Sequence, residues 1–177
     1  MDLSASTALL LLDMVNPFKF KNGEAHARIA REIAPPIAIL KARVREAGGR
    51  CIYVNDNFGS WRSNFLEICE RARNGLAPEV MTHLEPEDND LFVLKPRHSA
   101  FLQTPLPTLL DALGSEHLVI AGITADACVL MSALDAHMRG FDVQVPADCT
   151  AALSEERKAA ALLVMNNSNV ATTPGGS

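Results

Sequence analysis

The sequence lacks several features that would place it in a class at once. It has no block of basic residues, no C-x-x-C pair and no apolar stretch near the ~20 residues that a membrane-spanning helix needs. Without a basic block, the net charge of −5 gives no sign of binding to nucleic acid or to an anionic membrane surface. We therefore expect a small molecule or a second copy of the chain as partner, and neither nucleic acid nor membrane.

A disulfide framework and a secretory signal are also missing. The apolar run ALLLLDMV near the N-terminus is short, has no basic flank and contains Asp13, so it does not resemble a signal peptide. Reduced thiols are typical of chains of this kind. We expect a cytoplasmic protein whose four cysteines are free, at positions 51, 69, 128 and 149.

Metal-binding patterns are absent as well. The five histidines form no H-x-H or H-x-x-x-H pair, and these pairs are the common signature of a histidine metal site. Histidines without such spacing are usually surface or hydrogen-bonded structural residues. We expect neither a metal nor a cofactor.

The sequence contains enough apolar material for one core. It has 177 residues, of which 48% are hydrophobic and 21% charged. A chain of this size buries roughly 70% of its unfolded surface in one compact domain. We predict a single domain over residues 1–171, followed by a flexible tail at 172–177.

Short β-rich runs alternate with longer helical patterns along the chain. An uninterrupted apolar run such as TALLLLDMV (7–15) is typical of a strand buried on both faces. Strands are predicted at 7–15, 51–56, 91–95, 117–122 and 141–145, with a short edge strand near 169–172. Helices are predicted at 24–47, 67–73, 104–114, 125–140 and from 154 onward, and Pro35-Pro36 is expected to kink or split the first of them. This alternation predicts an α/β protein with three layers, αβα, around a parallel sheet.

Three reactive residues fall at the carboxyl ends of predicted strands, where ligands bind in such sheets. They are Asp13, Lys95 and Cys128. Each has an ordinary structural interpretation: Asp13 as a turn cap, Lys95 as a solvated charge, and Cys128 as core packing, because free cysteine is often buried. Together they are complementary, since a nearby lysine and a helix N-terminus lower the pKa of a thiol, and a carboxylate can take its proton.

The turn AGITADACV (121–129) adds a further element to this combination. Gly122 allows a sharp turn after the strand, and the backbone N–H groups of the turn then point toward the thiol. Such an arrangement is typical of an oxyanion hole beside a nucleophile.

With these residues in place, the chain resembles the isochorismatase-like cysteine hydrolase family, which includes nicotinamidases and N-carbamoylsarcosine amidohydrolases. The resemblance covers nearly the whole chain and rests on LLLLDMVNPF (9–18), LKPRHSAF (94–101) and AGITADACV followed by RGFDVQVPADCTAA (139–152). It implies a Rossmann-like fold with a six-stranded parallel sheet and a catalytic triad of Asp13, Lys95 and Cys128.

The resemblance also implies details of the site and of the reaction. A cis peptide bond is expected between Ile123 and Thr124, with an oxyanion hole made by the backbone N–H groups of Thr124 and Cys128. Cys128 would attack a carbonyl carbon while Asp13 takes the thiol proton and passes it to the leaving amine. Lys95 would hold both groups in register, and water activated by Asp13 would release the acid from a thioester.

Departures from the family pattern bear on the substrate. NDNFGSW (55–61) replaces the aspartate and histidines that bind metal in nicotinamidases, and Val15 and Pro17 replace a glutamine and an aspartate. Phe18 and Trp61 are candidates for the substrate pocket, although either could equally be core or interface filler.

The resemblance leaves three hypotheses for the function. Retention of Cys128 favours a small amide, ureido or related acyl substrate. The alternatives are a vinyl-ether hydrolase of the isochorismatase type and a non-catalytic, ligand-binding member of the fold. The resemblance further implies a homo-oligomer.

Overall fold

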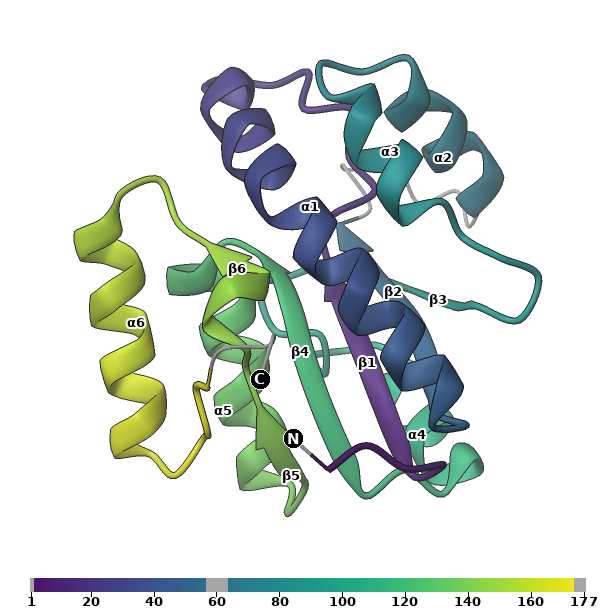
Figure 1. Ribbon diagram of the computed structural model, residues 1–177, viewed down its shortest axis with the longest axis vertical. Coiled ribbons are helices and arrows are strands. Elements are labelled where there is room, and N and C mark those ends of the chain that lie inside the picture. The colour runs from purple at the N-terminus through teal and green to yellow at the C-terminus, as the bar shows by residue number, and fades with distance from the viewer. Residues whose placement is uncertain (1, 57–63, 174–177) are drawn as a thin grey trace.

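The structure is a computed structural model that describes residues 2–56 and 64–173 (Figure 1). It contains one sheet of six parallel strands in the order β3-β2-β1-β4-β5, with β6 also paired to β4. The strands are β1 (Thr7–Leu12), β2 (Arg50–Asp56), β3 (Leu91–Lys95), β4 (His117–Ile123), β5 (Asp142–Gln144) and β6 (Thr150–Ala151). The predicted six-stranded parallel α/β sheet is confirmed.

Helices cover both faces of this sheet, so the three-layer arrangement is present (Figure 1). The helices are α1 (Gly23–Glu46), α2 (Phe65–Arg73), α3 (Pro78–Leu84), α4 (Leu106–Leu113), α5 (Leu130–Met138) and α6 (Glu155–Asn167). One core cluster joins the sheet to α1, α2 and α3, and the other joins it to α4, α5 and α6.

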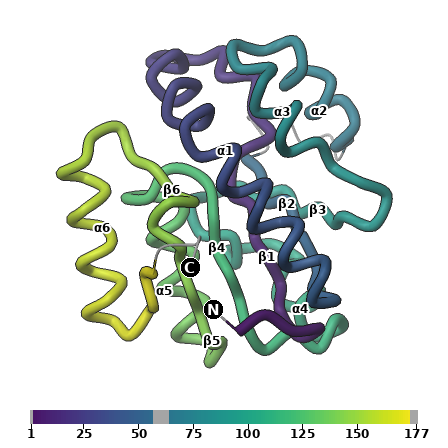
Figure 2. Tube along the Cα trace, viewed as in Figure 1, coloured from purple at the N-terminus to yellow at the C-terminus, as the bar shows by residue number. Residues whose placement is uncertain are grey.

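The strand β1 is buried on both of its faces, which explains its uninterrupted apolar sequence. Leu9 and Leu11 belong to the core on the α1 side, whereas Leu10 and Leu12 belong to the core on the α5 side. Successive side chains of a strand point to opposite faces, so a strand covered on both sides needs an apolar residue at every position. Figure 2 shows β1 lying beside β4, more than a hundred residues later in the chain, and the two strands pair from Thr7 with His117 to Leu12 with Gly122.

Of the kink or split expected in the first helix at Pro35-Pro36, the split is wrong. The helix α1 runs unbroken through both prolines. Each proline removes one backbone hydrogen bond, but the apolar face of α1 packs along the sheet on both sides of them, at Ile29, Ile33 and Leu40 among others. Tertiary packing therefore keeps the helix continuous across the prolines.

Other elements differ from the sequence-based prediction at their margins. The helix α3 and the strand β6 were not expected, because α3 is short and β6 has only two residues, too few to show a periodic pattern. The edge strand expected near 169–172 is an isolated bridge between Gln144 and Ala171. In the expected tail, the carbonyl of Thr173 accepts a hydrogen bond from the N–H of Ala147, and residues 174–177 lie outside the described chain.

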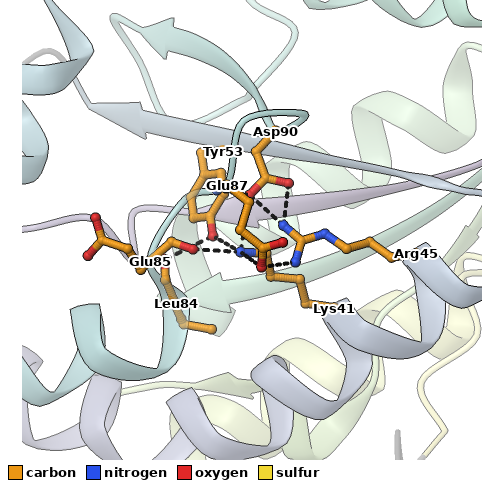
Figure 3. Close-up of polar contacts among 7 residues, drawn as sticks. All are labelled: Lys41, Arg45, Tyr53, Leu84, Glu85, Glu87 and Asp90. Atoms are coloured by element: carbon orange, nitrogen blue, oxygen red, sulfur yellow. Dashed lines mark hydrogen bonds and ion pairs between the residues drawn. The ribbon is translucent and has the colours of Figure 1, made fainter.

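A buried polar network attaches α1 to the sheet and to the segment before β3 (Figure 3). Lys41 Nζ donates to Tyr53 Oη at 2.7 Å and to the carbonyl of Glu85 at 2.8 Å, and lies 3.1 Å from Asp90 Oδ2. Asp90 also accepts from Arg45 Nη2 at 2.7 Å with both oxygens. Because removing one member would leave a buried charge unpaired, this network fixes how α1 is seated.

Gly122 lets the carboxyl end of β4 come close to that of β1. Its φ is +120°, and a Cβ atom built there would lie 2.1 Å from the carbonyl oxygen of Leu12. No other residue type fits between the two strands at this point. Since Asp13 follows Leu12 directly, the same close approach brings the segment after β4 next to Asp13.

Replacing this glycine tests the constraint. We expect Gly122→Ala to lower the free energy of unfolding by roughly 2–5 kcal/mol, because it combines a disfavoured φ with a clash against backbone. Gly114→Ala is the matched control, since Gly114 also has a positive φ of +62° but nothing within 4 Å of the place that a methyl group would occupy. Its cost should be about 1–2 kcal/mol. Urea unfolding of both variants measures the difference, and equal losses would contradict the close-approach explanation.

Candidate active site

The three residues singled out at strand ends meet at one edge of the sheet. Asp13 follows β1, Lys95 is the last residue of β3, and Cys128 lies in the turn after β4. Since β2 separates β3 from β1, the long side chain of Lys95 has to reach across the end of β2. The tertiary structure thus gathers side chains from both sides of the central strand.

Lys95 contacts both of the other groups. Its Nζ atom lies 2.8 Å from Asp13 Oδ2 and 3.3 Å from Cys128 Sγ. Lys95 is 1% exposed and Asp13 8% exposed, so this ion pair is almost completely withdrawn from water. A buried ammonium group is tolerated only with charged or hydrogen-bonded partners, which explains why the three side chains form one unit.

The backbone around Asp13 presents its carboxylate to this unit. Asp13 has a φ of +57°, in the left-handed region, and its N–H donates to the carbonyl of Val54 at 3.0 Å. The N–H of Asp56 donates to Asp13 Oδ1 at 2.8 Å. Both carboxylate oxygens therefore accept a hydrogen bond, one from the backbone and one from Lys95.

Cys128 lies in a π-helical turn, η1 (Ala125–Val129), that leads directly into α5. The peptide bond between Ile123 and Thr124, immediately before this turn, is cis. The N–H groups of Ala127 and Val129 both donate to the carbonyl of Thr124, which closes the turn around the cysteine.

The ionisation of Cys128 differs from the sequence-based expectation. Burial raises the pKa of the thiol to about 12, and the charge of Asp13 raises it as well, whereas Lys95 lowers it. Lys95 lowers the thiol pKa as the sequence predicted, but desolvation and the carboxylate outweigh the ammonium group, so the overall pKa is raised. For Lys95 itself, burial lowers the pKa, but the charges of Asp13 and Cys128 more than compensate and raise it overall. With its pKa raised in this way, the sulfur keeps its proton at neutral pH.

A cavity of about 890 Å³ opens above the sulfur. Asp13, Thr124 and Cys128 line its floor, and its other lining residues include Asn16, Lys19, Phe20, His26, Glu70, Arg71, Asn74 and His98. The walls thus come from the segment after β1, from α1, from α2 and from the loop after β3. A cavity of this size suits a small molecule.

The pocket role considered for Phe18 does not agree with the structure. Phe18 is fully buried in the core on the α1 side, while Phe20 is 45% exposed and lines the cavity, with its ring 5.2 Å from that of His26. The left-handed backbone at Phe18 turns the chain so that the second aromatic residue faces the cavity. Trp61, the other candidate, lies outside the described residues.

Sequence reasoning also missed His98. Its Nδ1 atom lies 3.5 Å from Cys128 Sγ, and the side chain is exposed to the cavity. The residue is part of LKPRHSAF, the segment that contributes Lys95, so its proximity to the nucleophile could have been suspected from the sequence.

The described part of the chain offers neither a metal cluster nor a membrane-spanning helix. No group of three or more His, Cys, Asp or Glu side chains there is arranged to hold a metal ion. Among residues 2–56 and 64–173, none of the helices is both long enough and apolar enough to cross a membrane.

The protein is a three-layer α/β protein with a cysteine-centred site. At the carboxyl edge of its parallel sheet, a lysine ammonium group contacts both a thiol and a carboxylate. Within that class the chain belongs to the isochorismatase family of hydrolases, whose Isochorismatase domain model matches residues 7–174. This match agrees with the resemblance drawn from the sequence motifs.

Individual relatives are similar over most of the chain. The uncharacterized isochorismatase family protein YaaI of Bacillus subtilis is 40% identical over 163 residues, which cover 92% of this chain and 90% of that protein. The ureidoacrylate amidohydrolase RutB of Pantoea ananatis is 30% identical over 153 residues, covering 70% of this chain and 60% of that protein. The crystal structure of N-carbamoylsarcosine amidase from Thermoplasma acidophilum superposes with a TM-score of 0.72, at 25% identity and 97% coverage of both chains.

The charges around the sulfur predict how its reactivity changes on mutation. Asp13→Asn removes a charge that raises the thiol pKa but keeps Lys95, so alkylation of Cys128 by iodoacetamide at neutral pH should become faster, by up to about tenfold for each pKa unit lost. Lys95→Met should slow it. In the wild type the rate should rise with pH toward the thiol pKa of about 12.

Time-resolved alkylation with peptide mapping measures these rates. Cys51, Cys69 and Cys149 serve as internal controls, because all three are buried and burial raises their pKa values. Slower alkylation of Cys128 in Asp13→Asn would show that the carboxylate does not oppose the thiolate.

Proposed function

We propose that the protein is a cysteine hydrolase that cleaves a small amide, ureido or related acyl substrate through a thioester intermediate. The observation that carries this proposal is the contact of Lys95 Nζ with both Asp13 and Cys128. The thiol can pass its proton to the carboxylate while the ammonium group stays in contact with both. The negative charge, whether on the carboxylate or on the sulfur, then always has the ammonium group as its partner.

In acylation, the thiol proton passes to Asp13 as the sulfur attacks the substrate. Cys128 Sγ forms a bond to the carbonyl carbon of the substrate, and the carbon–nitrogen bond then breaks as Asp13 passes the proton to the leaving nitrogen. The products of this half-reaction are ammonia or an amine and an acyl group on the sulfur. Because the resting group is a thiol, the base has to act in the same step as the attack.

The backbone of the turn after β4 supports the next part of the proposal. We assign the N–H groups of Thr124 and Cys128 to the oxyanion hole. This assignment is supported by the position of Thr124 and Cys128, which both line the cavity at the turn that carries the nucleophile. Donors fixed before the reaction stabilise the developing oxyanion without reorganising.

The substrate class follows from the cysteine and from the names of relatives. A thiol nucleophile suits an acyl carbon, and the similar proteins from Pantoea and Thermoplasma are named as hydrolases of a ureido and an N-carbamoyl compound. The cavity offers matching polar groups, with amides from Asn16 and Asn74 and cations from Lys19 and Arg71.

Release of ammonia tests this function directly. Across a panel of small amides and ureido compounds, Cys128→Ala should abolish the activity of the wild type, by roughly 10³-fold or more, as is typical for loss of a nucleophile. Its circular dichroism spectrum should not change. Cys51→Ala is the matched control, because Cys51 is buried in β2 and does not line the cavity.

The panel also separates the alternatives. Activity near the wild-type level in Cys128→Ala would favour a cysteine-independent reaction such as vinyl-ether hydrolysis. A wild-type protein that hydrolyses nothing in the panel and binds its members unchanged would favour a ligand-binding role.

We also propose that the chain assembles into a homo-oligomer, as its resemblance to the family implies. Sedimentation velocity should show a species whose mass is a multiple of the 19.1 kDa chain. A single species at the mass of one chain, over a range of concentrations, would contradict assembly.

A further inference from the structure

His98 faces the reacting sulfur from the solvent side. Its Nδ1 atom is 3.5 Å from Cys128 Sγ, and its side chain is exposed and lines the cavity. Lys95, which also contacts the sulfur, is 1% exposed. The sulfur therefore lies between a buried ammonium group and an imidazole that water can reach.

The loop that carries His98 is fixed to the same helical segment as the nucleophile. Ser99 Oγ donates to Asp135 Oδ2 at 2.6 Å, and the N–H of Ala100 donates to Ser132 Oγ at 2.9 Å. Ser132 and Asp135 are in α5, which continues from the turn that holds Cys128. These bonds on the adjacent residues hold the position of the imidazole relative to the sulfur.

The second half-reaction needs a base on the side from which water arrives. Asp13 also lines the cavity, but it is only 8% exposed and accepts hydrogen bonds from Lys95 and from the N–H of Asp56. His98 is in the cavity, and no side-chain partner other than Cys128 is found for it in the described part of the chain. A general base must reach the proton that it removes, directly or through one water.

We propose that His98 is a further catalytic residue, which activates the water that hydrolyses the thioester and returns the proton to the sulfur. This inference rests on the proposed function, since it needs an acyl group on Cys128. It assigns the two half-reactions to different bases, Asp13 for acylation and His98 for deacylation.

The proposed step conserves atoms and charge. Neutral His98, with its hydrogen on Nε2, accepts a proton at Nδ1 from a cavity water as the water oxygen bonds to the thioester carbon. The carbon–sulfur bond then breaks, the acid leaves, and the sulfur takes the proton from His98 Nδ1. Thiol, neutral imidazole and carboxylate are all restored, so no other reactant is required.

An activated ester separates the two halves of the reaction. The probe is p-nitrophenyl acetate, whose leaving group needs no proton, so the initial burst reports acylation and the steady rate reports deacylation. In His98→Gln the burst rate should stay within about twofold of wild type, while the steady rate falls roughly 10²-fold. Intact-mass analysis and peptide mapping should show the acetyl group accumulating on Cys128.

Two controls distinguish catalysis from a structural effect. His83→Gln replaces an exposed histidine of α3, outside the cavity, and should behave as wild type. In His98→Ala, added imidazole should restore the steady rate without changing the burst.

The outcomes separate this inference from the proposed function. Equal loss of burst and steady rate in His98→Gln, or a steady rate like that of wild type, would overturn the role of His98 while leaving Cys128 as nucleophile. Absence of an acetyl group on Cys128 in both the wild type and His98→Gln would overturn the nucleophile itself.

Discussion

The buried ion pair between Lys95 and Asp13 is the interaction on which the rest of the site depends. An ammonium group at 1% exposure cannot remain charged without close partners, and it finds them in a carboxylate at 2.8 Å and a sulfur at 3.3 Å. These partners come from the ends of different strands, so the charge balance of the site is also a constraint on how the carboxyl edge of the sheet is built. Asp13, Lys95 and Cys128 therefore both form the reactive site and determine how the strand ends are arranged.

The backbone meets this constraint at two adjacent strand ends. The left-handed conformation of Asp13 and the close approach of Gly122 to Leu12 lie side by side on β1 and β4. A positive φ is unfavourable for most residue types, and at both positions the packed core on the two faces of the sheet holds the backbone in place. Such local departures from regular geometry are commonly found at functional sites, and here they turn the carboxylate and the nucleophile toward one cavity.

The electrostatics of the site keep the resting thiol of Cys128 protonated and therefore weakly nucleophilic. Burial raises the pKa of Cys128 to about 12, so the resting sulfur keeps its proton, and attack requires a base at the moment of reaction. Asp13 and His98 both line the cavity, but Asp13 is almost completely buried whereas His98 is exposed. In the proposed division of proton transfer, Asp13 serves the leaving group and His98 serves the water.

Much of the fold and part of the site were predictable from the sequence, because they depend on local patterns. Apolar runs such as TALLLL identify buried strands, and strand ends in a parallel sheet point to Asp13, Lys95 and Cys128. The continuity of α1 through two prolines, the two-residue strand β6 and the inward burial of Phe18 were decided by packing between segments distant in sequence. The raised pKa of the thiol and the place of His98 beside it were likewise decided only by the tertiary structure. Desolvation and the distances between charges exist only once the chain has folded, whereas residue type and periodicity are present in the sequence itself.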